Sequence, residues 1–201
     1  MKQLHRITGI IVSIFIGAHL INHCLAVGGI ETHTSALEAL RKVYRIPVIE
    51  ILLISSFLFQ AISGVTLFTR LRKKEAKTSR EKVSMYSGLV LGCFILQHLG
   101  ATLGQRLFLE LDTNFYFASA VLHQSPLLFY FFPYYFAGIM SLGLHVASIH
   151  REKVEKFIGS GKARIHWVVM LSLFFGISIF ILLIFGGAFF EIEIPAEYLS
   201  K

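Results

Sequence analysis

Long apolar runs alternate with short charged connections along the chain. Five runs reach the length of about 20 residues that a helix needs to cross the hydrocarbon core of a bilayer. They cover residues 5–28, 47–70, 84–108, 126–150 and 165–190. The pattern predicts an all-α protein, a five-transmembrane-helix bundle forming a single membrane domain over residues 1–201, with no room for a separate soluble domain.

Composition supports a membrane protein. Hydrophobic residues make up 55% of the 201 residues and charged residues only 15%, whereas soluble domains carry about 25% charged residues. The first run follows basic residues, as the apolar part of a secretory signal does. Because His19, Asn22 and His23 interrupt it and four more runs follow, we expect a retained helix.

Basic residues are distributed unequally between the connections. Most of the 19 Lys and Arg residues precede the first run or lie in the connections 70–82 and 151–164. By the positive-inside rule, the N-terminus is predicted to be cytoplasmic and the C-terminus outside. We attribute the net charge of +7 to this topology. The sequence lacks the basic face with interleaved aromatic residues that would indicate nucleic-acid binding. We expect an integral membrane protein of a bacterial inner (plasma) membrane.

The connection after the first run is expected to be helical. In the segment THTSALEALRKVY, Ala36, Leu37, Leu40 and Tyr44 share one helical face. The segment is too short and too polar to span a bilayer. It is therefore predicted to lie on the membrane surface.

Two runs share a polar pattern. Gly9 and Gly88 each follow a hydroxyl residue, and each precedes a histidine, His19 or His98, by nine intervening residues. Both runs are predicted to cross in the same direction, so both imidazoles should lie about 15 Å beyond their glycines. Two imidazoles that face each other can be the axial ligands of a haem iron. The alternative is that each histidine hydrogen-bonds a neighbouring helix.

Other polar residues are weaker candidates. His145 is the other deep histidine, and aligning QAISG with HVASI places Gln60 opposite it. Glu50, at the start of the second run, lies close in depth to His19. It could exchange protons with a quinol, or it could be a solvated acid whose negative charge is favourable at the N-terminus of a helix. Of the remaining histidines, His23 lies on the same helical face as His19, nearer the outer surface, and could assist the site or be interfacial. His5 lies at the cytoplasmic edge of the first run. The others are expected at span ends or in connections without a role, namely His33, His123, His150 and His166.

A family resemblance rests on several short motifs. LHRITG, Leu4–Gly9, resembles the HRxSG signature that opens the first membrane helix in the cytochrome b anchors of succinate dehydrogenase and fumarate reductase. RIPVIEILL…FQAISGV and SPLLFYFF…LHVAS resemble the second and fourth helices of the single-chain, five-helix form. The whole chain is similar to this form in length and span order.

This resemblance implies a haem b-binding subunit without catalytic residues of its own. It would carry electrons between cytoplasmic flavoprotein and iron–sulfur subunits and membrane quinone. In the family, the first and third helices hold an outer haem, which matches His19 and His98. The second and fourth hold an inner haem, for which this chain offers His145 but has Gln60 in place of the second histidine.

The resemblance also implies quinone sites. It places quinone near His5, Arg6 and Thr8 on the inner side, or near Glu50 on the outer side. Because Gln is not a usual haem ligand, the number of haems per chain remains open at none, one or two. The alternative is a stand-alone or haem-free five-helix membrane protein of the same descent, without a dehydrogenase partner.

Overall fold

The computed structural model of the chain describes residues 1–199. These residues are largely helical and form no strand. Four helices are long and apolar enough to cross a membrane, namely α1 (Lys2–Leu25), α3 (Pro47–Arg72), α4 (Ser79–Phe108) and α6 (Leu127–Phe185). The shorter elements are η1 (Ala26–Gly28), α2 (Ile30–Tyr44), α5 (Phe115–Ala120) and η2 (Ala196–Tyr198).

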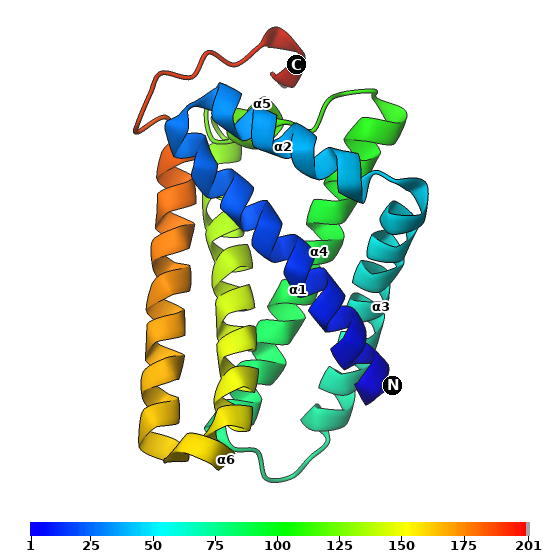
Figure 1. The fold of residues 1–201 in the computed structure, drawn as a ribbon, viewed down its shortest axis with the longest axis vertical. Helices are drawn as coiled ribbons and strands as arrows, with labels where there is room; N and C mark the ends of the chain where they lie inside the picture. The colour runs from blue at the N-terminus through cyan, green and yellow to red at the C-terminus, as the bar shows by residue number, and fades with distance from the viewer. Residues whose placement is uncertain (200–201) are drawn as a thin grey trace.

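Helix α6 reverses its direction at Gly159. This residue has a φ of 78°, in the left-handed region that glycine adopts without steric cost. Figure 1 shows the two limbs of α6 side by side, with the reversal at one end of the molecule. The runs 126–150 and 165–190 were expected to be separated by a charged connection. Helix continues through most of it, because Glu, Lys and Arg are good helix formers, and the second limb ends at Phe185 rather than at residue 190.

Local signals place the starts of α3 and α4. Pro47 occupies the first turn of α3, where its missing N–H is not needed. Thr78 and Glu81 form a reciprocal capping box, so α4 begins at Ser79, before the apolar run predicted from residue 84.

The elements gather at two ends of the bundle. Figure 1 shows α2, α5 and the C-terminal segment at one end, which we call the α2 end. The connection between α3 and α4 and the reversal of α6 lie at the opposite end. Helix α4 packs against both α3 and α6, and α1 packs mainly against α3.

Large apolar side chains cover much of the outer surface. Ile14, Val48 and Phe129 have 71%, 77% and 73% of their surface exposed. The buried core is concentrated at the α2 end, where Phe115 of α5 packs against Phe185 of α6. An exposed apolar surface of this extent suits contact with lipid, in agreement with a membrane protein.

Helix α2 lies across the end of the bundle and buries a polar as well as an apolar face. Its buried residues are His33, Leu37 and Arg41, spaced four apart. The Arg41 guanidinium contacts Asp112 Oδ1 and Glu38 Oε1, each at 2.6 Å. Burial alone would lower the pKa of Arg41, but the hydrogen bonds to Asp112 and Glu38 outweigh it and raise that pKa above its ordinary value.

Removing this arginine is expected to destabilise the α2 end. Arg41→Ala should lower the free energy of unfolding by about 1–3 kcal/mol, because Asp112 loses its partner and a buried space opens. Thermal unfolding of the purified protein in detergent measures the effect. Arg80→Ala is the matched control, since Arg80 is 45% exposed in its pair with Glu155, against 7% for Arg41, and an ion pair with this access to solvent should be worth less than about 1 kcal/mol. Equal losses in the two variants would contradict the prediction.

Candidate cofactor site

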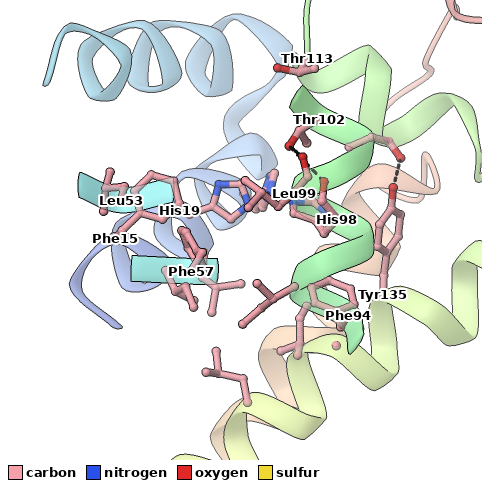
Figure 2. A pocket seen from close by; sticks show the side chains of 18 of the residues that line it. Phe15, His19, Leu53, Phe57, Phe94, His98, Leu99, Thr102, Thr113 and Tyr135 are labelled. Atoms are coloured by element: carbon pink, nitrogen blue, oxygen red, sulfur yellow. Dashed lines mark hydrogen bonds between the residues drawn. The ribbon is translucent and has the colours of Figure 1, made fainter. Parts of the chain in front are cut away.

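A cavity of about 250 Å³ lies between α1, α3, α4 and α6. It is larger than an engineered cavity of about 150 Å³ that admits benzene. Its walls are mostly apolar and aromatic, with Phe15 and Phe57 on one side and Phe94 and Tyr135 on the other (Figure 2). The charged lining residues all come from the helix ends and connection near α2: Arg45, Glu50 and Arg106.

His19 of α1 and His98 of α4 point toward one another in this cavity (Figure 2). Their ring centroids are 6.0 Å apart, and their planes make an angle of 65°. Phe15 stacks on His19 with centroids 5.9 Å apart, and Phe94 stacks on His98 at 5.4 Å. The structure thus brings together the two histidines that the sequence pattern paired.

Each of these two imidazole rings has a nitrogen that could bind a metal. His19 Nε2 lies 3.0 Å from His23 Nε2, and His19 Nδ1 has no hydrogen-bond partner among residues 1–199. The His98 ring makes no hydrogen bond with any residue that the structure describes. Imidazole–metal bonds are about 2 Å long, so two rings that bind one metal from opposite faces have centroids about 6 Å apart. The observed separation fits this arrangement.

Two further histidines extend the pair toward α2. His33 Nε2 lies 3.3 Å from His23 Nδ1 and 3.1 Å from Asn22 Nδ2. We expected His33 in a connection without a role, but it is only 1% exposed and packs edge-on against both Phe115 and Phe185. The spacing of four residues between His33, Leu37 and Arg41 on an amphipathic helix is the signal that could have revealed its burial.

His33 should make the stability of the protein depend on pH. Burial, together with the nearby charge of Arg41, lowers the pKa of His33 to about 4. Since this value lies below the ordinary value of 6.5, the folded state favours the neutral ring. The stabilisation is therefore fully present above pH 6.5 and is lost as the pH falls toward 4. Thermal unfolding at pH 7.5 and pH 4.5 should show a smaller loss in His33→Gln than in the wild type, and equal losses would contradict the prediction.

The residues that the resemblance assigned to the inner side form a separate cluster. Gln60 Nε2 donates hydrogen bonds to His5 O at 2.5 Å and to Thr8 Oγ1 at 2.7 Å. His5 Nδ1 lies 2.6 Å from Ser63 Oγ. A Cβ at Gly9 would lie 3.3 Å from Gln60 Nε2. The Gln60 amide thus fills the space beside Gly9 and ties α3 to α1, while Arg6 is exposed and makes no ion pair within residues 1–199.

His145 fills the matching space on α4. A Cβ at Gly88 would lie 2.9 Å from the His145 ring, and His145 Nδ1 lies 3.0 Å from Ser84 O. Gly9 and Gly88 thus accommodate the side chains of Gln60 and His145, neither of which lines the cavity of His19 and His98.

Glu50 belongs to the cavity rather than to open solvent. Its Oε1 lies 2.5 Å from Arg106 Nη2, and both side chains are partly buried. Sequence reasoning missed Arg106 because the ion pair joins residues far apart in the chain, on α3 and α4.

The cavity can therefore hold a flat apolar group between aromatic walls, with a metal bound between two imidazoles and charged groups at one end. Among residues 1–199, no three His, Cys, Asp or Glu side chains are arranged to hold a metal ion by themselves. Comparisons with protein-family models, with curated proteins and with solved structures found no match for the chain.

Proposed function

We propose that the chain is a haem b-binding membrane subunit that carries electrons between a cytoplasmic flavin and iron–sulfur dehydrogenase, of the succinate or fumarate type, and membrane quinone. The single observation that carries this proposal is the facing pair His19 and His98 inside an aromatic cavity. Haem supplies a one-electron carrier whose iron takes four nitrogens from the porphyrin and two from protein side chains. His19 and His98 would be those two ligands.

In this proposal the chain crosses a bacterial inner membrane five times, with the N-terminus in the cytoplasm. The reversal at Gly159 supports counting the two limbs of α6 as separate crossings. The connection between α3 and α4 and the reversal of α6 lie at the same end. Together with the helix ends that flank them, residues 70–82 and 151–164, they hold most of the Lys and Arg residues. This distribution supports a cytoplasmic position for that end.

The side chains around the two histidines would orient and shield the cofactor. Phe15 and Phe94 hold the planes of His19 and His98 by stacking on them. His23 holds one nitrogen of His19, as outer partners of metal-binding histidines commonly do. Glu50, paired with Arg106 at the α2 end, is the candidate for exchanging protons with quinone.

The cluster at the opposite end supports one haem rather than two. Gln60 stands where the family places its second histidine and is held by His5 and Thr8, while His145 packs on Gly88 with its Nδ1 3.0 Å from Ser84 O, so a second iron position lacks a pair of histidine ligands from α3 and α6. His19 lies about 25 Å along α1 from the start of that helix. A dehydrogenase at the cytoplasmic face would thus be far from the haem, which favours the second candidate, a stand-alone membrane protein of this descent without a dehydrogenase partner.

The test is a haem count. Protein purified from cells with ample haem is expected to show a sharp Soret band and about one haem per chain. Absence of haem under these conditions would overturn the proposal, and two haems per chain would overturn the single-site assignment. Co-purification of flavin and iron–sulfur subunits decides between the dehydrogenase subunit and the stand-alone protein.

A further inference from the structure

We propose that Arg45 binds a carboxylate at the edge of the group held in the cavity. This inference rests on the proposed function, in which the carboxylate is a haem propionate. Arg45 opens the motif RIPVIEILL, but neither the sequence pattern nor the resemblance gave it a role.

Arg45 is a cation left without a partner at the end of an apolar cavity. It follows α2 directly and lines the cavity together with His19 and His98. Its Nε is buried without a hydrogen-bond partner, and its guanidinium forms no ion pair with any described residue. Other arginines near α2 are paired, Arg41 with Asp112 and Arg106 with Glu50. A partly buried guanidinium carries a desolvation cost unless an acceptor is supplied.

Among the residues that the structure describes, no carboxylate in the cavity lining is free to accept hydrogen bonds from Arg45, so a bound ligand would have to supply the acceptor. Glu50 is the one carboxylate among the lining residues, and Arg106 already binds it. The hydroxyl of Thr113 also lines the cavity, beyond Thr102 in Figure 2, and donates to no described residue. The charged end thus presents an unpaired guanidinium and a free hydroxyl.

The guanidinium and the hydroxyl indicate which chemical group the ligand carries on the edge that faces them. A guanidinium binds a carboxylate with two parallel hydrogen bonds, and a hydroxyl can add a third. The opposite part of the cavity is aromatic and apolar. The group that fits both parts is flat and apolar over most of its area and carries a carboxylate on the edge that faces α2.

A lipid phosphate could also satisfy Arg45, since arginines near a membrane surface attract anionic headgroups. The two sources differ in one respect that can be tested. A carboxylate on the cavity ligand disappears when that ligand is esterified, whereas a lipid phosphate does not.

The experiment titrates the full-length chain, prepared without haem in neutral detergent, with haem b or with its dimethyl ester. Soret absorbance gives the dissociation constant of each. The wild type is expected to bind haem roughly 10- to 100-fold more tightly than the ester, the effect of charged hydrogen bonds. Arg45→Gln should weaken haem binding by a similar factor and leave ester binding unchanged. Arg45→Lys, which keeps the charge but loses the bidentate geometry, should lie between the two.

Arg151→Gln is the matched control. Arg151 also has a buried Nε without a partner, but it packs over Trp167 on α6 and does not line the cavity. Its replacement should change neither dissociation constant. Because the comparison of haem with its ester also works on the wild type alone, poor folding of a variant does not remove the test.

Equal binding of haem and ester by the wild type, or unchanged haem binding in Arg45→Gln, would overturn the inference and leave the proposed function standing. Loss of bound anionic phospholipid in Arg45→Gln, with haem binding unchanged, would overturn it in favour of a lipid phosphate. Absence of binding of either form by the wild type would overturn the proposed function, and the inference with it.

Discussion

Chains carrying His98→Ala or His19→Ala are expected to be purified without a sharp Soret band. Each replacement removes one of the two proposed axial ligands and leaves the other imidazole facing an enlarged cavity. Loss of an outer partner of a metal ligand already costs roughly 10- to 100-fold in affinity, so loss of a ligand itself should cost more. Haem per chain and low-temperature EPR of the purified variants measure the effect.

The control for this prediction is His166→Ala. His166 stacks on His150 with ring centroids 5.6 Å apart, but neither lines the cavity. The variant should keep the haem content of the wild type. Added imidazole should restore part of the spectrum in His98→Ala, because it can enter the vacated position. Full haem content in both ligand variants would contradict the assignment of His19 and His98.

Gly138→Ala is expected to lower both the stability of the protein and its haem content. A Cβ at Gly138 would lie 2.3 Å from Cε2 of Phe94, closer than real contacts allow. Phe94 stacks on His98, so a shift of its ring also displaces His98, the proposed ligand. Overpacking of this kind costs about 1–3 kcal/mol in the free energy of unfolding. Thermal unfolding and haem content of the same preparation measure the two effects together.

Gly176→Ala is the matched control on the other limb of α6. Apart from the adjacent residues and the nearby backbone of the same helix, no described atom lies within 4 Å of the Cβ position at Gly176. Alanine is the better helix former by about 1 kcal/mol, so this variant should be as stable as the wild type or slightly more stable. Wild-type stability and haem content in Gly138→Ala would show that Phe94 can move without affecting the site.

The sequence by itself determined the helical class, the apolar runs and the pairing of two histidines. These features depend on local properties. The length of an apolar run decides whether a helix can span a bilayer, and a capping box or an initial proline decides where the helix starts. The equal spacing of His19 and His98 from Gly9 and Gly88 fixes equal depth through the helical rise.

Only the tertiary structure decided which side chains meet. The burial of His33, the pairing of Glu50 with Arg106 and the packing of Phe94 on Gly138 all join separate segments of the chain. So do the contacts by which Gln60 and His145 fill the space beside Gly9 and Gly88. These contacts depend on how each helix is rotated and how it crosses its neighbours. Helix rotation and crossing follow from packing the whole bundle, whereas the periodicity of one segment reports only that segment.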